Sequence, residues 1–367
     1  MLRVLQIINN MDIGGMETML MNYYRNINRK RIQFDFLIFN ENKCFYEKEI
    51  NMLGGKIYRV VPRNKNVLKN REELAAFFKT HHYEIVEIHQ GVTYLLPLKL
   101  ASKNKVKNII IHNHGVDNKY KKGLYNLFRK YYVIPFISKY ATNYVACSNI
   151  VLSDLFSADI INNKKYLIVN NAIDVDPFSY NEGIRNRIRK ELGIGEERVV
   201  GHIGRFHIQK NQEFIIKLAK IMPEYKFLLV GDGESLAALK KEASDNVIFY
   251  GQSQKPYEII QAFDVFILPS RWEGLALVAI EAQANGLPTI LSDNVSREAK
   301  VSDNVRFLPL EVDLWERTIR SMSSCPRTRN EKMVIKNGYD VKKEVCKLEK
   351  FYTRINEIEY NKERKNK

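Results

Sequence analysis

Two glutamates eight positions apart stand out among the side chains that could do chemistry. They are Glu273 and Glu281, and every residue between them is apolar or glycine. If the segment is helical, Glu273 lies at the helix start and Glu281 about 12 Å along it, two turns further on. Such an apolar helix is buried, so Glu281 must find hydrogen-bond donors or lie against a ligand. Glu273 has a simpler explanation as an acid near a helix N-terminus.

Two cations follow another buried run, Gly201-His202-Ile203-Gly204, on a connection from a strand to a helix. In α/β proteins, ligands bind beyond the carboxyl ends of the strands. There Arg205 could hold a diphosphate through two parallel hydrogen bonds, and Lys210 could act on it as a point charge. A solvated loop is the alternative, since most arginines and lysines lie at the surface.

Glycines mark two more strand ends. Gly15 follows the run Ile7-Ile8 and precedes a helical segment, so the backbone there could approach an anion at a helix N-terminus. A plain turn between strand and helix explains the same pattern. The run Gly231-Asp232-Gly233 has Leu236 where a dinucleotide fingerprint has its third glycine, and we interpret it as a tight turn.

Histidines and acids that could bind metal give a weaker signal. His112 and His114 end an apolar run before Gly115; metal ligation stays open, although no acidic cluster accompanies the pair. The Asp174-Val175-Asp176 triplet lies in a predicted inter-domain loop and is interpreted as turn chemistry. Four scattered cysteines without a CxxC spacing indicate neither a disulfide framework nor a zinc site, and favour the cytosol.

The elements that must position these residues alternate between short β-branched runs and segments of helical spacing. Buried strands alternating with helices predict parallel sheets covered on both faces, and two such sets predict two doubly wound α/β domains. The predicted strands are 3–8, 32–39, 56–61, 84–89, 108–112, 142–147 and 166–169 in the first half, and 198–203, 226–230, 247–250, 264–268, 288–291 and 306–308 in the second.

The predicted domains are residues 1–172 and 173–340, because the segment Asn-Asn-Ala-Ile-Asp-Val-Asp-Pro breaks the periodicity near 170–180. Residues 341–360 form a polar helix pattern whose apolar stripe needs a surface to pack on. No apolar run approaches the ~20 residues of a membrane span, and the first residues predict a strand rather than a signal peptide.

The charge of the chain is asymmetric. The net charge is +16, and residues 1–170 carry +13 of it, from 26 Lys and Arg against 13 Asp and Glu. Within this half, residues 119–140 mix lysines with aromatic residues and leucines, a pattern that favours the interface of an anionic membrane. A solvated face over a buried helix is the alternative.

Taken in order, these motifs resemble those of the family 4 retaining glycosyltransferases with the GT-B fold. The resemblance covers nearly the whole chain and rests on Gly14-Gly15-Met16-Glu17, His112-Asn113-His114, Val169–Asp174, Gly204-Arg205 with Lys210-Asn211, Val230–Gly233, and the Glu273–Glu281 pair. Ala172 departs from the family, which usually has glycine there. The resemblance implies two Rossmann-like domains facing a cleft, with the terminal helix packed back on the first.

Site roles also follow from the resemblance. The second domain would bind a nucleotide-diphospho-sugar: Glu281 would accept the ribose hydroxyls and Glu273 would contact the sugar. The diphosphate would be held by Arg205, Lys210 and the backbone of Gly274, Leu275 and Ala276. From the first, acceptor-binding domain, Gly15 would approach the phosphates, and His114, with His112 less directly indicated, would reach the sugar.

The implied activity is metal-independent, retaining transfer of a sugar, with UDP the expected nucleotide, to a lipid-linked saccharide in bacterial exopolysaccharide or capsule synthesis. We expect no cofactor, no metal and no nucleic acid partner, and a cytoplasmic enzyme peripheral to the inner face of the membrane. Two alternatives remain: a nucleotide-sugar epimerase of the same fold, and a non-catalytic partner that binds sugar nucleotides.

Overall fold

The computed structural model describes residues 1–89, 95–115, 127–156, 160 and 166–365, and divides the chain into two compact units. The first unit contains Met1–Asn171 together with Val341–Lys367, and the second contains Ala172–Asp340. The divide falls one residue before the predicted one. The loop carrying it continues into a β-bridge between Ile173 and Asp340, both in the second unit.

Among the described residues, the first unit contains a seven-stranded parallel sheet of order β3-β2-β1-β4-β5-β6-β7. Its strands are β1 (Leu2–Ile8), β2 (Ile32–Ile38), β3 (Ile57–Arg59), β4 (Ile85–His89), β5 (Asn108–Asn113), β6 (Asn143–Ala146) and β7 (Tyr166–Ile168). Its helices are α1 (Gly15–Asn26), α2 (Glu47–Met52), α3 (Val67–Thr80), α4 (Leu95–Lys103), η2 (Arg129–Val133), α6 (Ile134–Tyr140), α7 (Asn149–Leu155) and α16 (Val341–Lys365).

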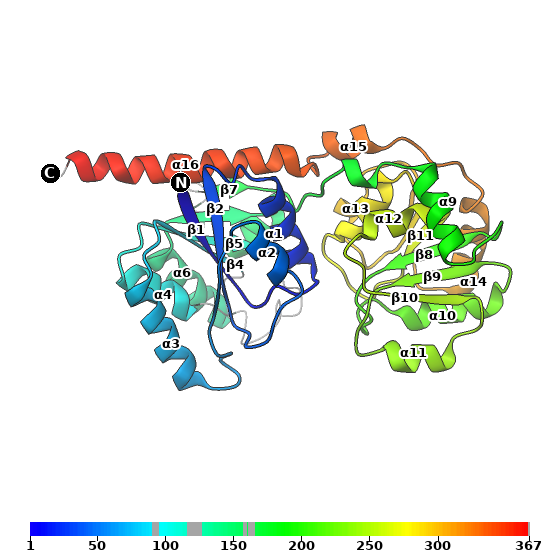
Figure 1. Cartoon of the computed structure of the whole chain (residues 1–367), viewed down its shortest axis with the longest axis horizontal. Coiled ribbons are helices and arrows are strands. Elements are labelled where there is room, and N and C mark those ends of the chain that lie inside the picture. Colours follow the sequence, from blue (N-terminus) through cyan, green and yellow to red (C-terminus); the bar gives the residue numbers. More distant parts are fainter. Residues whose placement is uncertain (90–94, 116–126, 157–159, 161–165, 366–367) are drawn as a thin grey trace. The chain divides into compact units, whose positions relative to one another are not determined.

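The two faces of this sheet are covered by different helices because side chains alternate along each strand. Leu5 and Ile7 point into a core with α3, α4 and α6, while Gln6 lies on the face that α1 and α16 cover. The terminal helix α16 therefore supplies its apolar stripe to the first unit, where Tyr352 is fully buried. Figure 1 shows this helix running along the sheet.

The second unit repeats the plan with a parallel sheet of order β10-β9-β8-β11-β12-β13, six strands within the described residues. The strands are β8 (Val199–Ile203), β9 (Lys226–Val230), β10 (Val247–Gly251), β11 (Val265–Leu268), β12 (Thr289–Ser292) and β13 (Val305–Leu308). The helices are η3 (Asp176–Phe178), α9 (Glu182–Glu191), α10 (Gln212–Ile221), α11 (Leu236–Glu242), α12 (Pro256–Ile259), η4 (Ile260–Ala262), α13 (Leu277–Ala284), η5 (Arg297–Ala299), α14 (Val312–Met322) and α15 (Glu331–Lys336).

All thirteen predicted strands are confirmed, with ends shifted by at most two residues. Both sheets are doubly wound, so strand order reverses at one point in each: between β1 and β4 in the first, and between β8 and β11 in the second. The connections leaving adjacent strands diverge there and open a crevice at the carboxyl edge, where α/β proteins bind ligands. The fold therefore offers two candidate positions for a ligand site, one at the switch point of each sheet.

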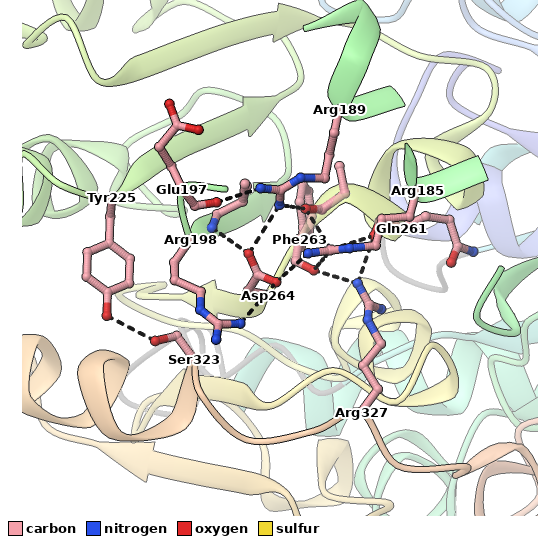
Figure 2. A network of polar contacts seen from close by, with 12 residues as sticks. Arg185, Arg189, Glu197, Arg198, Tyr225, Gln261, Phe263, Asp264, Ser323 and Arg327 are labelled. Carbon is pink, nitrogen blue, oxygen red and sulfur yellow. Dashed lines mark hydrogen bonds and ion pairs between the residues drawn. The ribbon is translucent and has the colours of Figure 1, made fainter. Parts of the chain in front are cut away.

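At the opposite, amino edge of the second sheet, Asp264 ties several segments together (Figure 2). Its carboxylate accepts hydrogen bonds from Arg185 at 2.6 Å, Arg189 at 3.3 Å and the Val199 amide at 2.7 Å. Arg327 donates to the carbonyls of Gln261 and Phe263 beside it. This cluster anchors α9 and the loop before β11.

Candidate active site

The loop after β8 carries Arg205 and Lys210, and the Gly231-Asp232-Gly233 turn after β9 holds its backbone. The amide of Gly204 donates to Val230 O at 2.9 Å, and the amide of Phe206 donates to Asp232 O at 2.8 Å. A Cβ atom at Gly231 would collide with the carbonyl of Gly204, and one at Gly233 with the carbonyl of Phe206. The turn therefore positions the cationic loop.

Lys210 reaches the neighbouring strand end because Asn211, the next residue, adopts a left-handed conformation with φ of 58°. Asparagine tolerates this conformation better than most residues, and its side chain donates to Pro269 O at 3.1 Å, just past β11. The Nζ atom of Lys210 then lies 2.6 Å from Oε2 of Glu273, with both side chains largely buried. Buried Ser270 contributes a further hydrogen bond to this carboxylate, at 3.4 Å.

Arg205 is more exposed than Lys210. Its side chain is 69% accessible and pairs with Glu234 at 3.2 Å, and His207 lies 3.3 Å from the same carboxylate. Exposed pairs of this kind contribute little to stability, so Arg205 can exchange Glu234 for a ligand at little cost. Glu234 had no predicted role.

The predicted position of Glu273 at a helix start is wrong. Helix α13 begins at Leu277, and Glu273 lies before it, in a loop whose backbone bridges Val295. The loop residues Gly274 and Leu275 and the cap residue Ala276 lead into the helix, and no side chain among the described residues caps it. A Cβ atom at Gly274 would meet nothing within 4 Å. In the first turn, the N–H of Ala279 donates to Ala276 O at 2.9 Å, and the N–H groups before it remain available to an anion.

Glu281 is the fifth residue of α13, so it lies one turn into the helix and not the two turns predicted from the sequence. The difference arises because four of the eight positions that separate it from Glu273 belong to the loop. Glu281 is 8% exposed, and no described residue donates a hydrogen bond to its carboxyl group. Burial raises the pKa of this carboxyl to about 7. The predicted burial of Glu281 is confirmed, and no described residue supplies the hydrogen-bond donor that the prediction calls for, so contact with a ligand stays a prediction.

In the first unit, Gly15 is the first residue of α1, and the helix has no side-chain cap. A Cβ atom at Gly15 would meet nothing within 4 Å, so the space beside its backbone is open. Burial raises the pKa of nearby Glu17 to about 7. Gly15 follows β1, and His114 lies just beyond β5, so both occupy the carboxyl edge of the first sheet.

Three histidines meet at this edge. His114 Nε2 lies 2.7 Å from Nδ1 of His89, and one nitrogen from each of His89, His112 and His114 falls within 4.8 Å of the others. The rings of His112 and His114 are stacked, with centroids 4.0 Å apart and planes 30° apart. Ring lone pairs lie in the ring plane, so stacked rings converge poorly on one metal ion. The arrangement favours hydrogen bonding over chelation.

The structure thus brings Lys210 and Glu273 together in the second unit, with Arg205, the start of α13 and Glu281 on the connections from β8 and β11. It places Gly15 and His114 in the first unit. Sequence reasoning missed the residues that hold these groups, Ser270 and Glu234 in one unit and His89 in the other. Their only sequence signal is that each lies at or just after a strand end.

Two protein-family models match the chain. The model described as "Glycosyltransferase Family 4" covers residues 13–177, and the one described as "Glycosyl transferases group 1" covers residues 184–341. The chain is 30% identical to EpsF of Bacillus subtilis (strain 168), which is named as a glycosyltransferase, with 98% of each protein covered.

A second relative is the UDP-Gal:alpha-D-GlcNAc-diphosphoundecaprenol alpha-1,3-galactosyltransferase of Escherichia coli, 26% identical over 79% of this chain and 81% of that protein. Among solved structures, HepE of Anabaena in complex with UDP and glucose superposes with a TM-score of 0.77 at 16% identity, covering 96% of this chain and 100% of that one. The two parallel sheets, the matching family models and the full-length similarity to EpsF show that this chain belongs to the family 4 glycosyltransferases and has the GT-B fold.

Proposed function

We propose that this glycosyltransferase moves a sugar from a UDP-sugar to a lipid-linked saccharide, with retention of anomeric configuration and without a metal ion, in exopolysaccharide or capsule synthesis. The observation that carries the proposal is the Lys210–Glu273 pair at the switch point of the second sheet, beside an uncapped helix. A cation, a carboxylate and free N–H groups at one strand edge suit a ligand with both phosphate and hydroxyl groups.

In this proposal, Lys210, Arg205 and the Gly274–Ala276 backbone hold the diphosphate. Glu273 accepts hydrogen bonds from sugar hydroxyls, and Glu281 accepts them from the ribose. Lys210 and Glu273 satisfy each other in the free protein, and the donor replaces their mutual contact with one partner for each. The UDP and glucose bound to HepE, a protein of the same fold, support a UDP-sugar as donor.

Cleavage of the donor places negative charge on the departing diphosphate. Fixed cations and N–H dipoles stabilise that charge where it develops, so the proposed site supplies the electrostatic part of catalysis from its own residues. The acceptor hydroxyl attacks from the face that the diphosphate leaves, which retains the configuration, and its proton passes to the departing diphosphate oxygen. This route does not require the flanking carboxylate pair of a glycosidase.

The proposed acceptor is a saccharide on a lipid diphosphate. The support is the similarity to the E. coli enzyme, which by its name acts on a diphosphoundecaprenol-linked sugar. Such an acceptor lies in a membrane, and no described helix of this chain is long and apolar enough to span one. We propose that the enzyme meets its acceptor at the membrane surface.

A surface suited to this role lies on η2 and α6. Residues 119–126 of the predicted membrane segment fall outside the described residues, but Leu127, Phe128, Tyr131 and Tyr132 are each about half exposed or more. Phe128, Tyr132 and Phe136 stack in succession along the segment, and Tyr140 packs against Phe136 with its ring tilted by 52°. Lys130 and Lys139 lie over neighbouring tyrosine rings. Aromatic rings with adjacent cations are typical of interfacial helices. We propose that the enzyme contacts the cytoplasmic face of the membrane through this surface of the protein.

The transfer test incubates the protein with radiolabelled UDP-glucose, UDP-galactose or UDP-GlcNAc, with and without GlcNAc-diphosphoundecaprenol. Acceptor-dependent appearance of label in the lipid fraction, with the linkage showing retention, supports the proposal. Interconversion of the sugar nucleotide without acceptor indicates the epimerase alternative. Binding of UDP without any conversion across the panel indicates the non-catalytic alternative.

The membrane test compares sedimentation with vesicles of neutral lipid and of neutral lipid containing anionic lipid, at low and high salt. We expect binding that needs anionic lipid and weakens with salt, since each basic residue near such a surface contributes about 1 kcal/mol. Tyr131→Ser with Tyr132→Ser should reduce it, and Tyr250→Ser, an exposed tyrosine on the second unit, should not. Binding indifferent to lipid charge and salt contradicts the electrostatic part.

A further inference from the structure

A polar network crosses three adjacent strands of the first sheet, on the face that α1 and α16 cover. Gln6 of β1 is in register with Glu87 of β4, and His89 of β4 is in register with His112 of β5. These four side chains are 3% exposed or less. Tyr352 of α16, 265 positions from Glu87 in the chain, donates its hydroxyl proton to Oε2 of that carboxylate. The network ends at His112 and His114, on the carboxyl edge.

Gln6 sets one branch of this network. Its amide Nε2 donates toward Oε2 of Glu87 at 3.4 Å, so its Oε1 is left to accept from Nε2 of His89, 2.7 Å away. Burial lowers the pKa of His89 and His114 well below the usual range, so each ring is neutral and carries one N–H. His89 donates its single N–H, on Nε2, to Gln6. Its Nδ1 must therefore accept a hydrogen bond from Nε2 of His114, 2.7 Å away. This leaves His114 with a lone pair on Nδ1.

Glu87 sets the other branch. Burial raises the pKa of its carboxyl, and the hydrogen bonds from Tyr352 and Gln6 offset only part of this rise. Its second oxygen, Oε1, lies 2.7 Å from Nδ1 of His112. With donors already on Oε2, the carboxylate accepts the Nδ1 proton of His112, whose pKa burial lowers to about 3. This leaves His112 with a lone pair on Nε2.

Both lone pairs are buried. Nε2 of His112 and Nδ1 of His114 make no hydrogen bond of good geometry with a described residue, and neither does Oδ1 of Asn171. Asn171 nevertheless lies beside His114, where a side-chain hydrogen bond between them raises the pKa of the ring. A network that served stability alone would satisfy its buried nitrogens, because each one left unpaired costs free energy. Acceptors held ready in this way suit the hydroxyl groups of a sugar.

We infer that Gln6, Glu87, His89 and Tyr352 are positioning residues that hold His112 and His114 as neutral hydrogen-bond acceptors for sugar hydroxyls. The inference deepens the proposed function and rests on it for the sugar as ligand. The tautomers themselves belong to the free protein: His112 protonated on Nδ1 and His114 protonated on Nε2. Through Tyr352, the terminal helix acts on a site carried by β4 and β5.

The tautomers are measured in long-range ¹H–¹⁵N spectra of ligand-free protein labelled with ¹⁵N-histidine. His112→Asn and His114→Asn assign the two rings among the seven histidines of the chain. We expect the Nδ1–H form at His112 and the Nε2–H form at His114. The Nε2–H form at His112, the Nδ1–H form at His114, or a cationic ring at either position near pH 7.5 overturns the inference. This result does not depend on which sugar the enzyme transfers.

A matched pair of variants tests whether Glu87 sets the tautomer. Glu87→Gln and Glu87→Met both remove the charge, but only glutamine keeps an oxygen that can accept from Nδ1 of His112. We expect the Nδ1–H form to persist in Glu87→Gln and to give way to Nε2–H in Glu87→Met. The same tautomer in both variants contradicts the role of Glu87. If the methionine variant does not fold, the wild-type spectrum still decides the tautomer.

Tyr352→Phe tests the contribution of α16, with Tyr24→Phe as its control. Tyr24 is equally buried in the same unit and donates to Leu53 O at 3.3 Å, away from the network. If both variants unfold at similar temperatures, we expect Tyr352→Phe alone to lower kcat/KM with the UDP-sugar by about tenfold, as loss of a hydrogen bond to a charged group does. Equal activity in the two variants removes Tyr352 from the mechanism. Absence of sugar transfer in the wild-type protein contradicts the proposed function, and the tautomers are then decided by the spectra alone.

Discussion

At the residue scale, Lys210 and Glu273 are each assigned to a ligand, yet in the free protein they bind each other at 2.6 Å. Their pairing keeps two partly buried charges compensated before a ligand arrives, which matters because an unpaired buried charge is strongly destabilising. Arg205 has the opposite situation, at the surface with a weak partner. The loop after β8 thus carries Lys210, which is held by a largely buried partner, and Arg205, whose exposed partner can be exchanged.

We expect Arg205→Ala and Lys210→Ala each to lower kcat by on the order of 10²-fold or more, since each removes a cation from the developing charge on the diphosphate. Initial rates of sugar transfer measure this. Lys220→Ala, an exposed lysine on α10, serves as the control and should retain activity. Wild-type turnover in either site variant would exclude that cation from the mechanism.

Glu281 is assigned to the ribose, and its substitutions separate acceptor chemistry from charge. Glu281→Ala should weaken UDP binding more than Glu281→Gln, because the amide keeps an oxygen for one ribose hydroxyl. Losing a charged hydrogen-bond partner costs about 1.5–3 kcal/mol, or roughly 10- to 150-fold in affinity. Calorimetry with UDP measures both variants, and equal affinities would contradict the assignment.

The pKa of about 7 at Glu281 also predicts a pH dependence. If ribose hydroxyls donate to the carboxylate, as proposed, they lower its pKa in the complex, and binding below pH 7 must then release a proton. UDP affinity should therefore fall as the pH falls below 7, by up to about tenfold per unit, and should level off above pH 8. Glu281→Gln supplies the baseline for the titration of UDP itself. Identical pH profiles for the two proteins would refute this prediction.

At the element scale, the two edges of the second sheet have different roles, one in the candidate site and the other in stability. The carboxyl edge carries the loops of the candidate site, and the amino edge carries the Asp264 cluster that anchors α9 and the strand β11 (Figure 2). Three arginines, Arg185, Arg189 and Arg327, lie largely buried around one carboxylate and the backbone carbonyls beside it. Because these arginines lie at the edge opposite the candidate site, a substitution among them can change stability without altering the residues of the site.

We expect Asp264→Ala to lower the free energy of unfolding by about 3–5 kcal/mol, because it leaves Arg185 and Arg189 without their buried counter-charge. Denaturant unfolding followed by circular dichroism measures the change. Asp303→Ala, at an exposed aspartate of the same unit, should stay within about 0.5 kcal/mol of wild type. A comparable loss in both variants would mean that the cluster contributes no more than a surface charge.

At the scale of the whole molecule, each unit contributes its own switch-point edge, and the basic excess is concentrated in the half that the proposal assigns to the acceptor. Residues 1–170 hold +13 of the +16 net charge. A field of this size attracts anionic surfaces and weakens with salt. It also suits an acceptor that carries a diphosphate of its own.

The enzyme as a whole should transfer sugar undiminished after dialysis against EDTA, because lysine, arginine and helix N–H groups are proposed to stabilise the leaving diphosphate. Rates before and after dialysis, with Mg²⁺ or Mn²⁺ added back, measure this. Loss of activity in chelator with recovery on adding either ion would require a metal in the mechanism, with the histidines at the carboxyl edge of the first sheet as its candidate ligands.

The sequence by itself determined the strands, the two doubly wound units and the motif residues of the candidate site. These are local properties: β-branched runs of three to eight residues predict buried strands, and Arg205, Lys210, Glu273 and Glu281 lie on connections that such strands define. The start of α13 was misplaced because an apolar segment with a glycine has no local signal separating loop from first turn.

Only the tertiary structure decided which distant side chains meet. Tyr352 and Glu87 are 265 positions apart, Arg185 and Asp264 are 79 apart, and Lys210 and Glu273 are 63 apart. Strand order and helix packing bring these groups within hydrogen-bond distance, and a single sequence carries no pattern that links them. The proton positions on His112 and His114 follow from such contacts, because a neutral imidazole places its proton where its neighbours accept it.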